Sequence, residues 1–137
     1  MSYNDNNIFA KILNGEIPCI KVYEDEQTLA FMDIMPQAEG HTLVIPKELA
    51  VTIHDLSDEA AADLIKKVKL VANAVKKGLN AQGITLFQLN GEAAGQTVPH
   101  IHFHVLPGNY STAKAHASIN ADQESLEKLA EKIRSGF

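Results

Sequence analysis

The feature that most constrains this chain is the segment 98–107, in which three histidines alternate with apolar residues. The imidazoles belong to His100, His102 and His104, at positions i, i+2 and i+4. The apolar residues interleaved with them are Ile101, Phe103 and Val105. In a strand, successive side chains point to opposite faces, so the imidazoles would share one face and the apolar side chains the other. In a helix the same spacing would scatter the histidines, and the β-branched and aromatic neighbours also disfavour a helix. We therefore predict a half-buried strand that carries a row of imidazoles and is ended by Pro107 and Gly108.

Three imidazoles on one strand face are hard to explain by packing alone, and two chemical interpretations remain open. The first is a metal site. The second is catalysis, because a histidine with a pKa of about 6.5 is mostly neutral at pH 7 and offers a nucleophilic ring nitrogen. A protonated imidazole beside it can bind a phosphate oxygen or protonate a leaving group. The loop 90–97 precedes the strand, and backbone N–H groups around Gly95 can approach an anion closely because glycine has no side chain.

Length, charge and cysteine content narrow the class of protein. A chain of 137 residues is large enough for one domain with its own core. The formal net charge is −5 and no run of five basic residues occurs, which disfavours general binding to nucleic acid or to anionic membranes. No segment approaches the roughly 20 apolar residues of a membrane span. The single cysteine, Cys19, cannot form an internal disulfide, which suits a reducing compartment. We therefore expect a cytoplasmic protein that binds neither nucleic acid nor membrane.

Hydrophobic periodicity and turn signals predict an alternation of helices and strands. Strands are predicted at 21–23, 28–32, 41–45, 84–89 and 98–107, and helices at 8–14, at 58–78 and after Asn120, which is the expected cap of the last helix. The apolar stripe predicted for the long helix consists of Ala61, Leu64, Ile65, Val68, Val71, Ala72 and Val75. Strands and helices that are joined by hairpin-length links predict an α+β fold with an antiparallel sheet. We expect a flexible N-terminus at 1–6, a domain at 7–108 and a C-terminal extension at 109–137 that carries the last helix.

Three stretches together carry a resemblance to a known family. Residues 100–106 read His-Ile-His-Phe-His-Val-Leu and follow Gly95-Gln96-Thr97. Residues 33–41 read Asp-Ile-Met-Pro-Gln-Ala-Glu-Gly-His, and residues 43–47 read Leu-Val-Ile-Pro-Lys. In combination these stretches resemble the histidine triad (HIT) family of nucleotide hydrolases and transferases, over roughly residues 7–108. The resemblance implies a five-stranded antiparallel sheet with a long central helix, and usually a homodimer formed through that helix and the strand after it.

The resemblance also implies a role for each matched residue. His102 matches the middle histidine, the nucleophile that forms a nucleotidyl-histidine intermediate at the α-phosphorus of a purine nucleotide. His100 and His104 match flanking partners that orient it and hold phosphate oxygens, and His41 matches a fourth histidine that hydrogen-bonds within the triad. Asp33 matches the acid that binds the ribose hydroxyls. The matched residues near the phosphates and the leaving group are Asn90, Gly95, Gln96 and Thr97, and those that line the purine pocket are Ile8, Phe9, Ile12, Phe31 and Ile34.

One departure from the family concerns zinc. Many bacterial members have Cys-x-x-Cys where this chain has Asn7-Ile8-Phe9-Ala10, and a histidine shortly after the Ile-Pro-Lys run, where this chain has Glu48-Leu49. Three ligands of that zinc site are missing, and zinc takes about four. We therefore predict no structural zinc, and no cofactor is implied.

Three functions from different classes fit these residues. The favoured one is an enzyme that cleaves a purine nucleotide conjugate, either a nucleoside phosphoramidate or a dinucleoside polyphosphate, at its α-phosphate through His102. The second is a purine-nucleotide-binding regulatory module with little turnover. The third is a metal-dependent hydrolase that uses the triad as ligands, for which the sequence offers no matched carboxylate.

Overall fold

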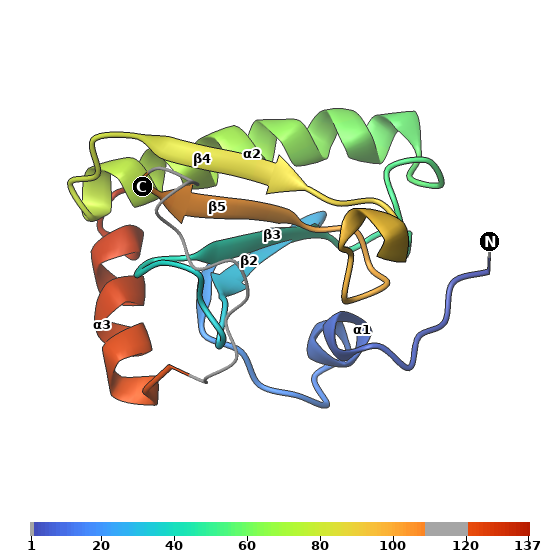
Figure 1. Ribbon diagram of the computed structural model, residues 1–137, viewed down its shortest axis with the longest axis horizontal. Coiled ribbons are helices and arrows are strands. Elements are labelled where there is room, and N and C mark those ends of the chain that lie inside the picture. Colours follow the sequence, from blue (N-terminus) through green and yellow to red (C-terminus); the bar gives the residue numbers. More distant parts are fainter. Residues whose placement is uncertain (1, 109–120) are drawn as a thin grey trace.

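The computed structural model describes residues 2–108 and 121–137 (Figure 1). Its five strands form one antiparallel sheet in the order β1-β2-β3-β5-β4. The strands are β1 (Lys21–Glu24), β2 (Thr28–Met32), β3 (Thr42–Pro46), β4 (Ile84–Gln88) and β5 (Phe103–Pro107). The helices are α1 (Ile8–Leu13), α2 (Asp58–Gly78) and α3 (Gln123–Arg134), with one turn of 3₁₀-helix, η1 (Glu92–Ala94). The predicted α+β fold, with its long helix and C-terminal helix, is confirmed.

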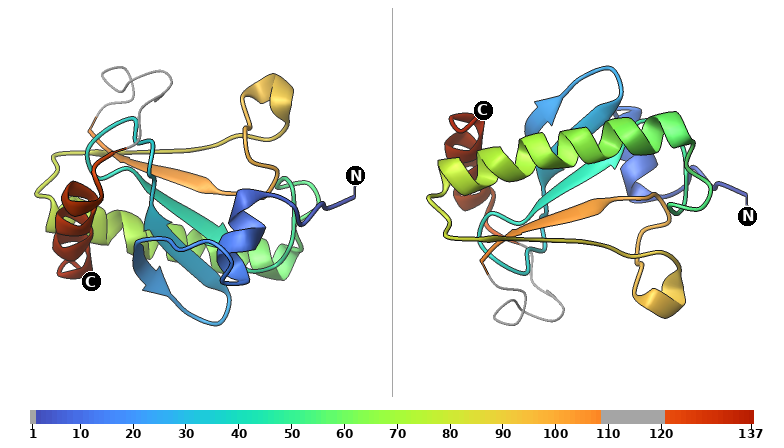
Figure 2. Two further views of the ribbon diagram at one scale, coloured as in Figure 1. Left: turned by 90° about the horizontal axis from the view of Figure 1, so that it is seen from below. Right: turned by 90° about the horizontal axis from the view of Figure 1, so that it is seen from above.

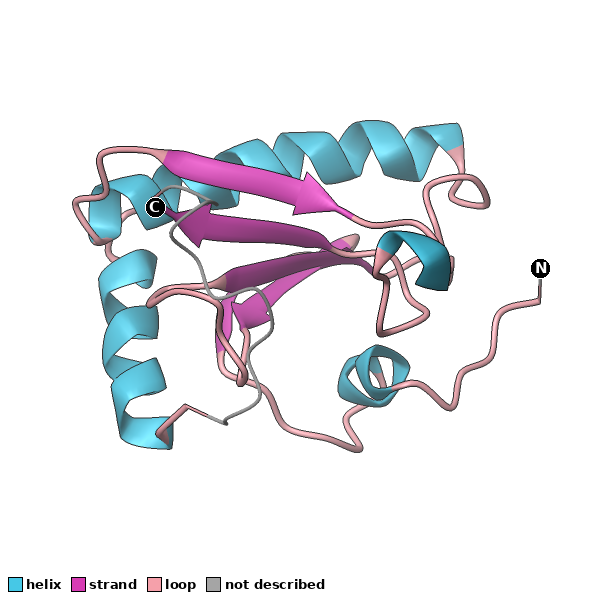
Figure 3. Cartoon of the chain, viewed as in Figure 1, coloured by secondary structure: helices cyan, strands magenta, loops and turns pink. Residues whose placement is uncertain are grey.

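The sheet separates two hydrophobic cores, one under α2 and one under α1, which lie on opposite sides of it (Figures 1 and 3). Strand β2 contributes to both cores, because its side chains alternate between the faces. Ala30 and Met32 enter the core under α2, whereas Leu29 and Phe31 enter the core that Phe9 of α1 closes. The central strands are therefore buried on both faces.

Helix α2 begins at Asp58, as the sequence predicted, and Ser57 caps it, since the Ser57 hydroxyl accepts a hydrogen bond from the Ala60 N–H at 3.1 Å. It runs along one face of the sheet (Figure 2). The predicted apolar stripe was wrong at Ile65, whose side chain is 52% exposed, and it omitted Ala74, which is buried. The buried face of α2 is narrower than the apolar stripe in its sequence, because only part of an apolar helix face can contact the sheet.

Helix α3 lies at the C-terminal end of α2 (Figure 2), and the two helices touch backbone to backbone. A β-carbon on Gly78 would collide with the Lys132 carbonyl, and one on Gly136 would collide with the Ala74 carbonyl. The cap of α3 is Asp122, whose side chain accepts from the Ser125 N–H at 3.0 Å. The sequence had predicted Asn120 for this role, a residue that lies outside the described part of the chain.

The histidine strand is shorter than predicted. Strand β5 begins at Phe103 rather than at residue 98, and it pairs with β3 only as far as Val44. The reason is Pro46, which has no N–H to donate to a ladder. Beyond that point the Ile101 N–H bonds the Ala50 carbonyl at 2.9 Å instead, so residues 98–102 leave the sheet and enter a loop next to it.

Among the described residues, no helix combines the length and apolar character that a membrane crossing requires. The cytoplasmic location stays a prediction. Residues 2–6 form no helix or strand.

Candidate active site

The catalytic candidates meet on the face of the sheet that α1 covers. His104 pairs with Leu43 in the β3–β5 ladder, and His102 lies just before β5, with Phe9 packed edge-on against its ring at a centroid distance of 4.9 Å. Ile101 and Val105 point the other way and are fully buried under α2. The predicted alternation of imidazoles and core side chains is therefore confirmed.

The turn between β2 and β3 brings a fourth histidine and a carboxylate to the same face. Asp33 directly follows β2 and His41 directly precedes β3, and the Asp33 N–H donates to the His41 carbonyl at 3.0 Å. This bond closes the loop 33–41, so residues that are eight apart in the sequence become neighbours. His41 is 1% exposed.

The proton of His102 is assigned by the backbone. The Nδ1 atom of His102 lies 2.7 Å from the His100 carbonyl oxygen, and a carbonyl can only accept. The proton therefore sits on Nδ1, and Nε2 keeps a free lone pair. Burial lowers the pKa of His102, so the ring is neutral at pH 7. This is the state in which an imidazole nitrogen attacks an electrophile.

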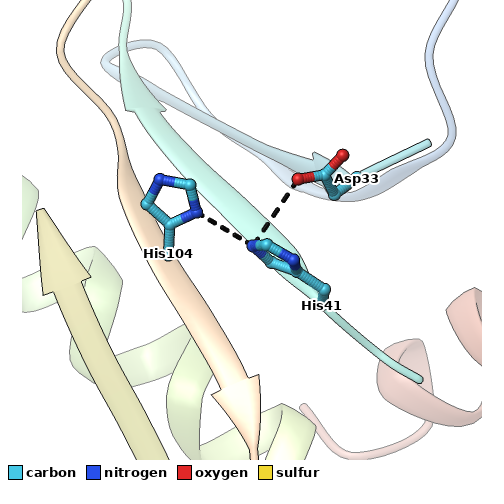
Figure 4. A group of neighbouring side chains, drawn as sticks. All are labelled: Asp33, His41 and His104. Carbon is cyan, nitrogen blue, oxygen red and sulfur yellow. Dashed lines mark hydrogen bonds and ion pairs between the residues drawn. The ribbon is translucent and has the colours of Figure 1, made fainter. Parts of the chain in front are cut away.

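A relay of hydrogen bonds orders His41 and His104 (Figure 4). The Gln37 N–H donates to His41 Nδ1 at 3.0 Å, so the His41 proton lies on Nε2. That N–H donates to His104 Nδ1 at 2.9 Å and lies 3.5 Å from Asp33 Oδ2. His104 then carries its own proton on Nε2, and its ring stacks on Phe87 at a centroid distance of 4.1 Å. The relay leaves one N–H donor, that of His104, for a ligand.

The histidines of this relay are uncharged. Burial lowers the pKa of His41 to about 4 and that of His104 to about 3. The sequence had suggested that a protonated imidazole beside the nucleophile binds phosphate. With these pKa values the free protein offers neutral N–H donors instead, so the contact between Asp33 and His41 is a carboxylate beside a neutral imidazole rather than an ion pair.

His100 lies behind the site and not in it. Its ring is fully buried, with Nε2 donating to the Pro46 carbonyl at 2.9 Å and Nδ1 accepting from the Tyr3 hydroxyl at 2.7 Å. Both ring nitrogens are engaged, so in this arrangement neither is available to a phosphate oxygen. The predicted role in orienting His102 fits this position, through the His100 carbonyl.

The Gln96 side chain holds the loop 90–97 in place. Gln96 is buried, donates to the carbonyls of Val51 at 2.7 Å and Val98 at 3.0 Å, and accepts from the Gly91 N–H at 2.7 Å. The backbone N–H groups of Gly95 and Gln96 also bond within the loop. The predicted phosphate donors Gly95 and Gln96 are thus committed to loop structure. Thr97 is exposed, and its contact with phosphate stays a prediction.

Asn90 ties the same loop to a distant segment. Its Oδ1 atom accepts from the Ile53 N–H at 2.8 Å and from Gln88 Nε2 at 2.7 Å, while its Nδ2 atom donates to Gln88 Oε1 at 2.9 Å. The Asn90 side chain therefore links β4 to the 51–53 segment, and its predicted place near phosphate stays a prediction.

The predicted nucleotide pocket divides into accessible and buried residues. Ile8 and Ile34 expose 39% and 46% of their surface, which suits contact with a base. Phe9 and Phe31 are buried against each other, and Phe31 belongs to the core, while Ile12 is half-buried beside them. Asp33 has one oxygen in a turn with the Met35 N–H and the other near His41, and burial raises its pKa to about 6.

The residues do not fit the zinc site of bacterial relatives. At the positions of the Cys-x-x-Cys pair, Asn7 caps α1 by accepting from the Ala10 N–H, and Ala10 offers no ligand atom. The cysteines would have supplied thiolates, which an amide and a methyl group cannot replace.

A different group of ligand atoms does converge within 4.8 Å, from Asp33, His41 and His104. Asp33 supplies the carboxylate ligand that the sequence analysis did not find for a metal site. The sequence feature that could have pointed to it is its place in the turn that joins β2 to β3. The chemistry of His41 weighs against a metal here. A metal on His41 Nε2 would move the ring proton to Nδ1, where it would face the Gln37 N–H. The group fits a shared proton better than a cation.

Comparison with known proteins adds a family match and three similar proteins. The HIT domain matches residues 14–111 of the chain. The adenosine 5'-monophosphoramidase hnt1 of Schizosaccharomyces pombe is 41% identical over 131 residues, which cover 93% of this chain and 96% of that protein. A Hit-like protein involved in cell-cycle regulation from Bartonella henselae is 47% identical, covers both chains completely and superposes with a TM-score of 0.93. A zinc-bound histidine triad protein from Mycobacterium smegmatis is 36% identical with a TM-score of 0.81, covering 96% of this chain and 92% of its own.

Proposed function

The chain belongs to the histidine triad (HIT) family, and from that premise we propose that it hydrolyses a purine nucleotide conjugate at the α-phosphate with His102 as nucleophile. One observation carries the proposal. The His100 carbonyl holds the His102 proton on Nδ1 at 2.7 Å, which leaves Nε2 bare toward the site. A nucleophile that is neutral and already in its reactive tautomer needs no separate base.

The proposed reaction has two steps. In the first, His102 Nε2 attacks the α-phosphorus, the bond to the leaving group breaks, and the leaving group departs with a proton taken from solvent. A nucleotidyl-histidine intermediate results. In the second, water attacks the same phosphorus, loses a proton to solvent, and displaces the neutral imidazole, so that the nucleoside monophosphate is released. The His104 Nε2–H and the Thr97 hydroxyl are the proposed donors to the phosphoryl oxygens, where negative charge develops.

The favoured substrate is an adenosine phosphoramidate, because the S. pombe relative is named an adenosine 5'-monophosphoramidase. Asp33 is the proposed ligand of the ribose hydroxyls, and the exposed Ile8 and Ile34 offer apolar surface to the base. Dinucleoside polyphosphates carry the same α-phosphate and are the second substrate class to test.

We also propose that the protein is a homodimer through α2 and β4. Strand β4 is at the edge of the sheet, and Leu86 on it is 44% exposed. Together with Ile65 of α2 it lines a shallow apolar groove. An edge strand beside exposed apolar side chains is a surface that a second copy can cover.

The test is a turnover screen of adenosine phosphoramidate against diadenosine polyphosphates, with His102→Ala as the variant. We expect wild-type turnover of at least one substrate class, and a loss of about a thousandfold or more in His102→Ala with AMP binding retained. The matched control is His54→Ala, which removes an exposed imidazole outside the site and should leave turnover unchanged.

Three outcomes would count against the proposal. His102→Ala with more than about a tenth of the wild-type rate would show that the residue is not a covalent nucleophile. Each assay is repeated in excess chelator, where turnover should persist. A loss that added zinc restores would favour the metal-dependent hydrolase, and AMP binding without turnover of any substrate would favour the regulatory module.

A further inference from the structure

The N-terminal segment reaches the back of the site through one side chain. The Tyr3 hydroxyl lies 2.7 Å from His100 Nδ1, and its ring meets the His100 ring edge-on at a centroid distance of 5.6 Å. Tyr3 is half-buried in an otherwise exposed segment, and burial raises its pKa. A residue 97 positions away in sequence thus fills the hydrogen-bonding capacity of a triad histidine.

The direction of this hydrogen bond is fixed by its neighbours. His100 Nε2 faces the Pro46 carbonyl at 2.9 Å and must carry the proton, which leaves Nδ1 as an acceptor. The Tyr3 hydroxyl accepts from Asn7 Nδ2 at 2.9 Å, so its own proton points to His100. Asn7 cannot turn the other way, because its oxygen accepts from the Ala10 N–H at 2.9 Å. Each donor and acceptor in this series of hydrogen bonds, from Asn7 through Tyr3 to His100, has a single consistent assignment.

These contacts connect Tyr3 to the proposed nucleophile, His102. The carbonyl of His100 accepts the Nδ1–H of His102, and the ring of the same residue is held by Tyr3 and Pro46. Phe9 packs edge-on against both imidazoles, with centroid distances of 6.4 Å to His100 and 4.9 Å to His102. A shift of the His100 ring would therefore shift the carbonyl that assigns the proton of His102.

We propose that Tyr3 is a positioning residue of the active site, which holds His100 so that its carbonyl keeps His102 in the reactive tautomer. The proposal rests on the proposed function of His102. Without the hydroxyl, a fully buried ring nitrogen has no donor, and such a group is costly to leave unsatisfied. The ring then moves or admits water, and small displacements near a nucleophile reduce its rate strongly.

The experiment compares Tyr3→Phe with Tyr23→Phe. Both variants lose one phenolic oxygen, but the Tyr23 hydroxyl donates to Asp25 at 2.7 Å on the strand β1 side of the molecule. We expect Tyr3→Phe to lower kcat about tenfold with KM within about twofold, and Tyr23→Phe to leave both unchanged. Thermal unfolding of each variant checks that both remain folded at the assay temperature.

A spectroscopic readout separates positioning from mere structural support. In ¹⁵N NMR of the histidine rings, wild-type His100 should show a protonated Nε2 and a hydrogen-bonded Nδ1. In Tyr3→Phe the Nδ1 signal should move toward that of an unbonded nitrogen, and the His102 ring signals should move with it. The acid limb of the kcat/KM profile should shift to lower pH, because the His100 carbonyl contact raises the pKa of His102 and would be weakened.

A second variant, Asn7→Asp, tests the polarity of the chain without removing the tyrosine. Aspartate still caps α1 by accepting from the Ala10 N–H, so the helix should be preserved. Its second oxygen would face the Tyr3 hydroxyl and take the proton that otherwise goes to His100. We expect the same loss of kcat and the same change in the His100 ring signals as in Tyr3→Phe.

The outcomes distinguish this proposal from the proposed function. If the wild type turns over no substrate, the function is wrong, and the ring signals of His100 and His102 still decide whether Tyr3 positions them. If the wild type is active and Tyr3→Phe matches Tyr23→Phe in both kcat and ring signals, the positioning role is overturned.

Discussion

At the scale of single residues, the site is defined by where its protons lie. A carbonyl assigns the proton of His102 and a backbone amide assigns that of His41, at 2.7 Å and 3.0 Å. His104 inherits its tautomer from His41. A phosphate would thus meet oriented neutral dipoles and a bare nitrogen, carried by rings that are largely buried, where such dipoles act more strongly than in water.

The sequence predicted that His41, His102 and His104 meet, but not how they hydrogen-bond to one another. The alternation of His102 and His104 with core residues follows from strand geometry, and the sequence therefore indicates it directly. The protons depend on the Gln37 N–H, which lies in the loop 33–41, and on the carbonyls of His100 and of Pro46 at the end of β3, and tertiary structure brings these groups together. The commitment of Gln96 to the carbonyl of Val51, 45 residues away, is equally a product of tertiary structure.

Asp33 is expected to distinguish ribose from deoxyribose. A carboxylate accepts from both vicinal hydroxyls, and each such bond is worth roughly 1.5–3 kcal/mol. We expect 2'-dAMP to bind about tenfold or more weakly than AMP, and Asp33→Asn to erase most of that difference while keeping the turn to Met35. Calorimetric titration of both nucleotides measures it, with Asp5→Asn as the control for charge. Equal affinities in the wild type would show that Asp33 is a turn residue only.

At the scale of elements, the pattern predicted which helices and strands form but not where each stops or what covers it. Strand β5 is short because its partner β3 ends at Pro46, and a proline effect on a neighbouring strand is not visible within the histidine segment itself. Ile65 belongs to an apolar helix stripe, but its part of the stripe lies beyond the sheet. An apolar residue that belongs to a helix stripe but is exposed in the single chain indicates a surface that another chain can bury.

The α2–β4 face is expected to hold two copies together. Leu86→Lys places a charge on the exposed edge strand and should convert the protein to a monomer, because burying an unpaired ammonium group is costly. Light scattering after size-exclusion chromatography measures the mass. Leu49→Lys is the matched control, since Leu49 is 54% exposed outside this face. A wild-type protein of monomer mass would contradict the proposed dimer.

At the scale of the whole molecule, the fold brings polar rings into a core. The α+β class, the antiparallel sheet and the long helix could be predicted, because periodicity and link length set them. The sequence could not show that only 1% of His41 and 0% of His100 would stay exposed, because burial depends on how α1 covers its side of the sheet. Buried imidazoles make the stability of the whole molecule sensitive to acid.

Stability should fall as the pH falls from about 6.5 to about 4. In the folded protein the pKa is about 4 for His41 and His100 and about 3 for His104, below the ordinary 6.5, so the unfolded chain binds more protons in this range. Asp33 acts in the opposite sense, because its folded pKa of about 6 lies above the ordinary 3.8. The histidines outnumber it, and at pH 5 unfolding should take up roughly two protons from these four groups.

Urea unfolding at pH 7, 6 and 5 measures this dependence through the free energy of unfolding. His104→Asn removes one buried imidazole and should make the dependence shallower. A wild-type stability that stays constant or rises on acidification would mean that these rings are protonated in the folded protein.

The carbonyl that holds the proton of His102 has a consequence for how such a chain can change over generations. Every residue type has a carbonyl oxygen, so the position of this proton depends on the backbone path at residue 100, which Tyr3 is proposed to hold, and not on which side chain residue 100 carries. Substitutions at the exposed rim, at Ile8 or Ile34, leave that path intact. If the proposed function holds, a lineage can therefore change the nucleotide conjugate that it accepts and keep the tautomer of the proposed nucleophile.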